Sequence, residues 1–256
     1  MMYTPTQSAG TPPTLTVLLS RLTYLNSRRN QLFVDYIAPD LDHTMIEKLY
    51  HKPIVFARKA EQFPMNFQKW SFHCAVVALD FMKKLDVVRN LEPEDRELLL
   101  IPSFLKNALL ENAMRAKRLK VEEARFPDGS DVLPVDAPCF PAYFLNRIRC
   151  RLVGRLIELK VTTEEFLLVS VILLCNPTLS SLSAHAITVI EAYQKVYTNA
   201  LLQHCLLTHQ QFGPSRCQDL LSLCHVIEKT LEDCTHYWML FFLEKEKNGT
   251  AFVCDR

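Results

Sequence analysis

The stretch LDFMKKLDVVRNLEPEDRELLL, residues 79–100, decides the fold of this chain. Its first part ends an amphipathic helix with the pair Lys83 and Lys84, and a short link leads to a second helix that begins at Pro93. Proline suits the first helical position because its missing N–H has no partner to lose there. The acids that follow lie in the first turn, where the helix dipole favours anions. The stretch therefore predicts two helices in close succession.

The composition is that of one ordinary globular domain. The chain has 256 residues, of which 49% are hydrophobic, and a formal net charge of +1. This length can bury roughly 70–75% of the unfolded surface, and the near-neutral charge argues against a nucleic-acid surface. The longest apolar run, residues 166–175, is about half as long as a membrane span requires. Nine scattered cysteines without a CxxC motif predict reduced thiols in an intracellular protein and no metal site.

Apolar residues recur at helical spacing along most of the chain. This spacing predicts helices over residues 15–31, 67–85, 93–120, 144–159, 163–175, 183–207 and 215–245. Pro102 lies inside the third of these and predicts a kink near Leu98. Residues 1–14 are polar and unpatterned, so they are expected to be a flexible N-terminal segment. Four prolines exclude a helix between the third and fourth helices, where Asp128–Gly129 predicts a turn with a two-stranded ribbon on its flanks.

This order of helices, ribbon and helices resembles the ligand-binding domain of nuclear hormone receptors. Residues 81–100 have the register of the family's third and fourth helices: an aromatic residue, a lysine, a short link, a leucine, an aspartate and paired leucines. TTEEFLLVSVILLCNPTLSSLS, residues 162–183, is similar to the eighth helix and its exit. SRCQDLLSLCHVIEKTLEDCTHYWMLFF, residues 215–242, has the position and length of the helix that forms the family's dimer face.

The likeness is greatest to the divergent nematode receptors related to hepatocyte nuclear factor four. It implies an all-α fold, a three-layer antiparallel helical sandwich with one small β-ribbon, over residues 15–256. It also implies a protein of the nucleus, or of cytoplasm and nucleus, that is not an enzyme. The paired cysteines of a zinc-finger DNA-binding domain are absent, so the chain is not expected to bind DNA directly.

The resemblance gives the lysine pair a function. In the family, a lysine at the position of Lys83 caps the C-terminal carbonyls of a leucine-rich coregulator helix, where the negative end of the helix dipole favours a cation. The groove beside it is expected from apolar side chains, namely Val87, Val88 and Leu99. Without the resemblance, lysines at a helix end are ordinarily solvated. Residues 244–256 are too short and too polar for the family's final helix, so ligand-switched coactivator recruitment of the usual kind is not expected.

Arg115 matches the family position whose arginine holds the carboxylate of fatty acids or retinoids. An arginine that faces an apolar cavity needs a bidentate anion; alternatively, Arg115 belongs to a charged, solvated helix end, RAKRLK. The resemblance places further ligand contacts on residues that the bare sequence assigns to the core: Trp70, Ser71, Cys74, Phe104 and Ala108. It gives Asp95 and Glu165 structural roles. The arginine that usually pairs with the glutamate looks replaced around residues 228–229.

Two functions are open at this point. The leading hypothesis is the ligand-binding domain of a transcription regulator that binds a hydrophobic ligand such as a fatty acid, binds coregulators, and forms homodimers or heterodimers through its long C-terminal helix. The alternative is a ligand-independent dimerisation or corepressor scaffold that lacks the activation helix. No cofactor beyond a bound lipid and no membrane contact is expected. A large cavity bordered by Arg115 favours the first hypothesis, and an interior filled by Trp70 and Phe104 favours the second.

Overall fold

The computed structural model describes residues 14–38, 49–50, 52–60, 64–133 and 140–247. Residues 1–13 of the expected flexible segment fall outside these ranges, as do residues 248–256 of the C-terminal stretch that is expected to be too short and too polar for the family's final helix. Within them, no helix combines the length and apolarity needed to cross a bilayer.

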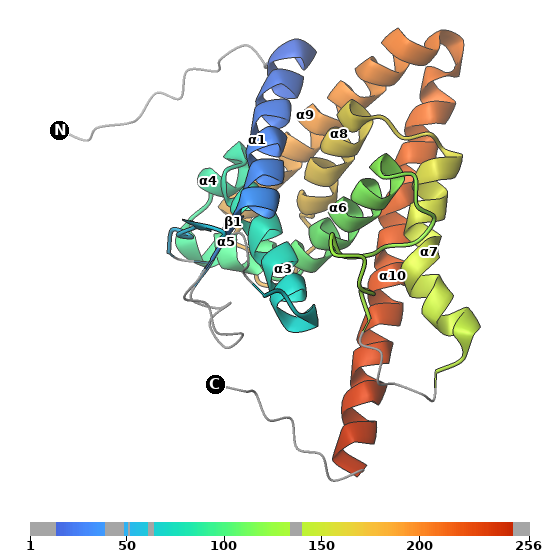
Figure 1. Ribbon diagram of the computed structural model, residues 1–256. Coiled ribbons are helices and arrows are strands. Elements are labelled where there is room, and N and C mark those ends of the chain that lie inside the picture. The colour runs from blue at the N-terminus through green and yellow to red at the C-terminus, as the bar shows by residue number, and fades with distance from the viewer. Residues whose placement is uncertain (1–13, 39–48, 51, 61–63, 134–139, 248–256) are drawn as a thin grey trace, which may run out of the picture.

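Most of the described chain is helical, with a very small sheet (Figure 1). The elements in chain order are α1 Leu15–Asp35, β1 Tyr36–Ile37, β2 Ala57–Arg58, α3 Phe67–Lys83, α4 Asp86–Arg89, α5 Pro93–Leu100, α6 Phe104–Arg118, α7 Ala142–Glu158, α8 Thr163–Leu174, α9 Ala184–His209, a 3₁₀ turn Gln210–Phe212, and α10 Gly213–Lys247. The helices predicted from apolar spacing are confirmed, apart from the one that contains Pro102.

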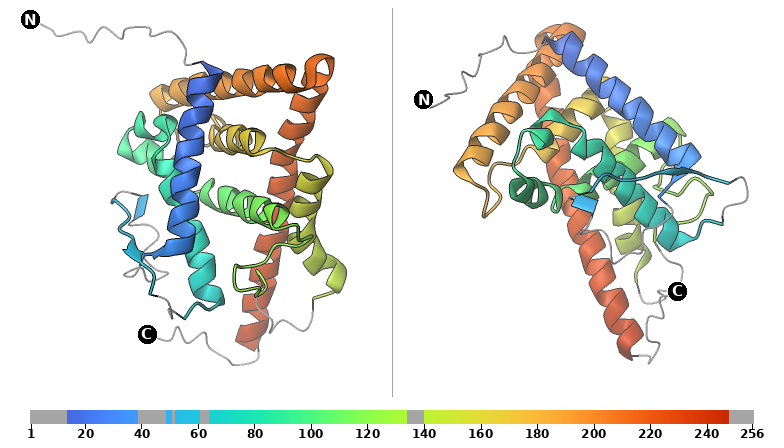
Figure 2. Two further views of the ribbon diagram at one scale, coloured as in Figure 1. Left: turned by 45° about the horizontal axis from the view of Figure 1, so that its top comes forward. Right: turned by 90° about the vertical axis from the view of Figure 1, so that its left-hand side faces the viewer.

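The helices pack in three layers (Figure 2). Helices α1 and α3 form one outer layer, α6 and α8 the middle layer, and α7 and α10 the other outer layer, while α9 lies along one end. The expected three-layer helical sandwich is therefore confirmed.

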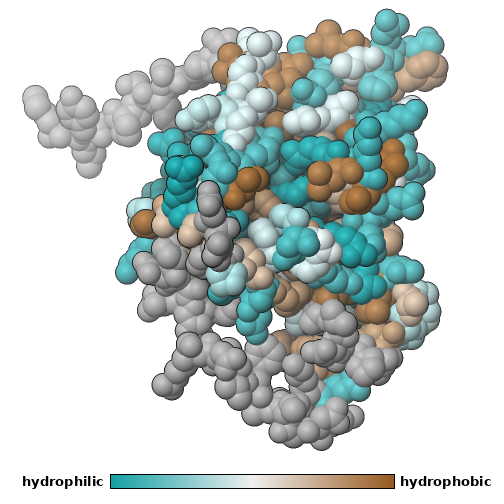
Figure 3. Space-filling view, in the orientation of Figure 1, coloured by the Kyte–Doolittle hydropathy of each residue, from teal (hydrophilic) through white to brown (hydrophobic). Residues whose placement is uncertain are grey.

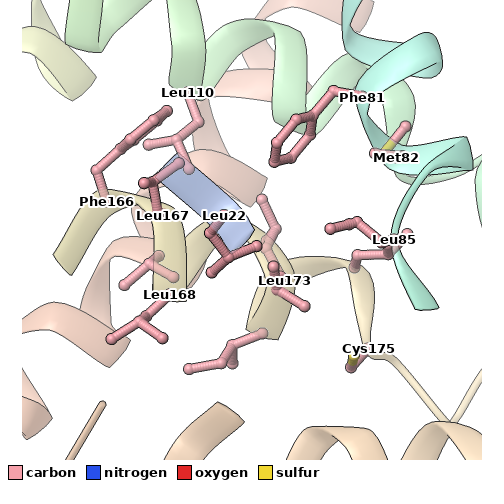
Figure 4. Close-up of a cluster of buried hydrophobic side chains, with 14 of the residues drawn as sticks. Leu22, Phe81, Met82, Leu85, Leu110, Phe166, Leu167, Leu168, Leu173 and Cys175 are labelled. Atoms are coloured by element: carbon pink, nitrogen blue, oxygen red, sulfur yellow. The ribbon is translucent and has the colours of Figure 1, made fainter. Parts of the chain in front are cut away.

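Helix α8 is the centre of the core because it is apolar on every side. Its residues from Phe166 to Leu174 are all buried, and a helix that is hydrophobic all round can only be stable inside the protein. Leu22 of α1, Phe81 of α3 and Leu110 of α6 converge on it (Figure 4). On the face seen in Figure 1, exposed hydrophobic side chains form separate patches among hydrophilic ones (Figure 3), the ordinary pattern of a protein surface.

Two local predictions need correction. The single helix expected over residues 93–120 is two helices, because Pro102 lies in a turn between α5 and α6. Its ring and missing N–H break the helix instead of bending it. The ribbon expected around Asp128–Gly129 is reduced to one bridge, between Arg125 and Asp131. The turn itself is present, with Gly129 at a φ of +83°, and the small sheet instead pairs β1 with β2 in antiparallel register.

Candidate functional site

A largely apolar cavity of about 210 Å³ lies between α3, α6, α7 and α10. Aliphatic and aromatic side chains form most of its wall. A few polar side chains join them, namely Ser71, Asn112, Arg149, Thr230 and Thr235. An apolar hollow with a few polar groups is typical of small-molecule sites, although this one is smaller than the roughly 300–1,000 Å³ usual for drug-sized ligands.

Arg149 is the charged residue on the described wall of the cavity, and its charge is already paired. Its Nε donates a hydrogen bond to Asp131 Oδ1 at 2.9 Å, and its Nη2 pairs with the other carboxylate oxygen. The same aspartate accepts a hydrogen bond from the backbone N–H of Leu133 at 3.0 Å. An acidic ligand would therefore have to compete with Asp131 for this guanidinium.

The structure brings three of the predicted ligand contacts together and not the others. Ser71, Cys74 and Ala108 line the cavity, whereas Trp70 and Phe104 do not. The indole N–H of Trp70 donates to Asp128 Oδ2 at 2.7 Å, and the ring packs against Phe33 and Phe126. The ring of Phe104 packs against Tyr50, with centroids 6.4 Å apart. The expected positions of Trp70 and Phe104 in the ligand cavity are thus not supported.

Arg115 also lies off the cavity, in a half-buried position. Its guanidinium stacks 3.5 Å from the ring centroid of Phe33, donates to Asn112 Oδ1 at 2.8 Å, and has Nη2 3.5 Å from the carboxylate of Glu111. Burial lowers the pKa of Arg115, and the charge of Glu111 opposes that shift. The arginine lines a small void of about 10 Å³ that shares Cys74, Ala108 and Asn112 with the cavity. It is therefore neither a solvated helix end nor an open anion site.

Glu111 gathers three arginines, a feature that sequence reasoning missed. Arg29 Nη2 lies 2.5 Å from its carboxylate, Arg118 Nη2 lies 2.7 Å from it, and Arg115 is the third. The guanidinium of Arg29 also lies over the ring of Phe81, at 4.3 Å. The sequence did offer one signal for this cluster: Glu111 and Arg29 fall on the faces of α6 and α1 that are buried. The cluster joins these two helices.

A hollow lies beside Lys83, and two of the four residues predicted for a coregulator groove line it. Lys83 and Val88 line a hollow of about 220 Å³, together with Arg96 and Leu100. Val87 and Leu99 do not line this hollow, although all four apolar residues, Val88 and Leu100 included, belong to the hydrophobic core. Of the residues expected to form the groove, Lys83 and Val88 thus lie at this hollow, and Val87 and Leu99 do not.

The two acids assigned structural roles hold helix ends. Asp95 accepts hydrogen bonds from the backbone N–H and the hydroxyl of Ser183, at 2.9 and 2.7 Å, and so ties α5 to the start of α9. The oxygens of Glu165 accept from Arg216 Nε and Nη2 at 2.7 and 2.6 Å, which ties α8 to the first turns of α10. Arg216, not the pair at 228–229, is the partner of the glutamate. No sequence pattern connects two residues so far apart.

No metal cluster accompanies these features: in the part of the chain that the structure describes, no three His, Cys, Asp or Glu side chains gather in a way that could hold an ion.

Comparisons with known proteins agree with this geometry. The model of the ligand-binding domain of nuclear hormone receptor matches residues 63–243. Among similar proteins of Caenorhabditis elegans, nuclear hormone receptor family member nhr-167 is 36% identical over 87% of this chain and 65% of its own length. Family member nhr-9 is 37% identical over 77% of this chain and 59% of its own length, and nhr-27 is 34% identical over 88% and 64%. The chain thus spans less than two thirds of these relatives. Nuclear hormone receptors are not enzymes, and a match over this much of a three-layer helical fold shows that the chain belongs to the nuclear hormone receptor family, in the part that forms the ligand-binding domain.

Proposed function

We propose that the chain is the ligand-binding domain of a transcription regulator of the nucleus, which binds a hydrophobic ligand in the cavity between α3, α6, α7 and α10. The apolar wall of that cavity is the observation that carries the proposal. Coregulator binding beside Lys83 and dimerisation through α10 belong to the same proposal. So does a relationship to the nematode receptors that are related to hepatocyte nuclear factor four; the three Caenorhabditis elegans relatives support the nematode part of it.

The ligand that best fits this cavity is compact and uncharged. The volume of about 210 Å³ disfavours a long acyl chain. The guanidinium of Arg149 is paired with Asp131, and that of Arg115 is held by Asn112 and Phe33. A carboxylate would have to compete with one of these partners, and each hydrogen bond lost in that exchange costs about 0.5–1.5 kcal/mol. An acidic lipid held by Arg115 is the second candidate, since Arg115 lies just behind Asn112 on the cavity wall.

Ala75→Phe is expected to weaken binding of 1-decanol at least tenfold, because Ala75 lies on the wall and a phenyl ring there would fill the space. Native mass spectrometry of the purified protein, with 1-decanol and decanoic acid as probes, measures this. Ala192→Phe, at an exposed position of α9, is the matched control and should bind as the wild type does.

Equal binding by Ala75→Phe and wild type would contradict this site. A preference for decanoic acid that Arg115→Ala removes would favour the acidic lipid. If the wild type binds neither 1-decanol nor decanoic acid, the ligand-binding function is contradicted and the ligand-independent scaffold is favoured.

Helix α10 supports the dimerisation part of the proposal. It extends beyond the other helices (Figures 1 and 2), and its C-terminal third exposes Met239, Leu240, Phe242 and Leu243. The solvent-facing side of the N-terminal part of α10 is polar, with exposed Gln218, Ser222, His225 and Lys229. Clustered exposed apolar side chains mark interaction surfaces. We therefore place the contact with a second receptor subunit at the C-terminal third of α10.

Leu240→Glu is expected to shift the protein from dimer to monomer at micromolar concentration, because burial of a carboxylate at an apolar contact is unfavourable. Analytical ultracentrifugation of wild type and variant measures the change. Leu119→Glu places the same charge at another exposed leucine, at the end of α6, and should leave the oligomeric state unchanged. A wild type that sediments as a monomer throughout would contradict the proposal.

A further inference from the structure

The hollow beside Lys83 is filled in part by the chain's own segment. Lys83 Nζ donates hydrogen bonds to the backbone carbonyl oxygens of Leu49 and Lys52, at 2.5 and 2.6 Å. Leu49 and Tyr50 are helical and only 5% and 6% exposed. Hydrogen bonds from an ammonium group to backbone carbonyls are charge-assisted and therefore strong. The ammonium of Lys83 thus already holds carbonyls of the kind that a coregulator helix would offer.

The side chains of this segment cover the apolar part of the hollow. Leu49 and Tyr50 belong to the main hydrophobic core, and the Tyr50 ring lies 6.4 Å from that of Phe104. Tyr50, Lys52 and Pro53 line the hollow together with Val88 and Leu100. Both requirements of a leucine-rich peptide, an apolar floor and a capping cation, are therefore met from within the chain.

The neighbouring cationic side chains do not bind the carbonyls of this segment. Lys84 pairs with Asp80 in the preceding turn of α3. Arg96 directs its Nε to the carbonyl oxygen of Leu91 at 2.6 Å and its Nη2 to that of Arg89 at 3.1 Å. Lys83 is half-buried, and burial lowers its pKa. If the carbonyl oxygens of Leu49 and Lys52 moved away, the Lys83 ammonium would lose both acceptors. A peptide that binds there must therefore supply acceptors of its own.

We propose that Leu49, Tyr50, Lys52 and Pro53 form a built-in competitor for the coregulator groove, so that a leucine-rich coregulator helix docks on Val88, Leu100 and Lys83 only after this segment has left. The proposal rests on the coregulator function proposed above and adds its regulation. The segment and a coregulator helix would use the same two contacts, namely the Lys83 ammonium for their carbonyls and the apolar floor of the hollow for their side chains. Both cannot be bound at once. The affinity of the wild type for a coregulator is then reduced by the fraction of molecules in which the segment is docked.

Leu49→Ala/Tyr50→Ala is expected to bind a fluorescein-labelled LxxLL peptide at least tenfold more tightly than the wild type in fluorescence polarisation. The double variant removes the two side chains that hold the segment in place. Tyr24→Ala/Leu119→Ala makes the same pair of truncations at exposed positions and should bind as the wild type does. Equal affinity of wild type and Leu49→Ala/Tyr50→Ala, with both folded by circular dichroism, overturns the competition.

Hydrogen exchange separates this inference from the function on which it rests. Lys83→Met keeps the apolar stem and should speed amide exchange over residues 49–56 at least tenfold, whereas Lys84→Met should not. Unchanged exchange in Lys83→Met overturns the docked segment even if the peptide binds. Faster exchange without peptide binding to any variant supports the docking contact but overturns the coregulator function, and the competition with it.

Discussion

Glu165→Gln is expected to lower the free energy of unfolding by about 3–5 kcal/mol, the usual cost of removing one partner of a buried ion pair. Glu165 is 0% exposed and receives Arg216 through two hydrogen bonds, with a third from the backbone N–H of Thr162 at 2.8 Å. Glutamine has the same shape but no charge, so the guanidinium of Arg216 would remain without its counter-charge. The contact joins α8 to α10, and its loss weakens the attachment of the helix that lines both the cavity and the proposed dimer surface.

Urea unfolding of wild type and variant measures this loss. Glu158→Gln is the matched control: Glu158 pairs with Arg155 three residues earlier, at 2.8 Å, but its side chain is 66% exposed. Exposed pairs of this kind contribute about 0–1 kcal/mol. Equal effects of the two substitutions would show that the buried pair does not hold the helices together.

The same contact predicts the direction of a pH effect. Burial opposes the charged form of Glu165, but the hydrogen bonds from Arg216 and Thr162 outweigh it and hold the pKa of the carboxyl below its usual value. A depressed carboxyl pKa contributes stability that is present above the ordinary pKa of glutamate and is lost as the pH falls through the folded-state value.

The helices could be predicted from the sequence because apolar residues at helical spacing report one local property, the buried face. The cavity could not, because it depends on how four helices meet. Ser71 lines it and its neighbour Trp70 does not, since successive residues of a helix point about 100° apart. A resemblance to the family aligns the helix but does not determine which of two adjacent residues faces the cavity.

The partners of the charged residues likewise could not be predicted from the sequence. Lys83 was identified as a capping lysine, but the carbonyls it caps belong to residues 49 and 52, in a stretch without clear periodicity. Arg216 and Glu165 lie 51 positions apart. Strands of two residues, such as β1 and β2, are too short to show an alternating pattern.

His73 is expected to make the protein less stable as the pH falls from 7 to 4, by about 3 kcal/mol in the free energy of unfolding. The imidazole is buried between α3 and α1, and its Nε2–H donates to the carbonyl oxygen of Phe33 at 3.0 Å. Burial lowers the pKa of His73 to about 4, against the bond to Phe33, which raises it; the charges of Lys59 and Arg115 lower it further. The unfolded chain takes up a proton near the ordinary value of about 6.5, whereas the folded chain does so only near 4. Between these values the unfolded state binds more protons, so stability is fully present above this window and is lost across it as the pH decreases.

Urea unfolding at several pH values, with wild type beside His73→Gln, isolates this contribution, because glutamine can still donate to the Phe33 carbonyl but does not titrate. The unfolding free energy of the wild type minus that of His73→Gln should fall by about 3 kcal/mol from pH 7 to pH 4. His225→Gln removes an exposed histidine of α10 and should leave the wild-type pH dependence intact. A constant difference between wild type and His73→Gln across this range would show that His73 is not the buried neutral group that makes the α1–α3 contact sensitive to acid.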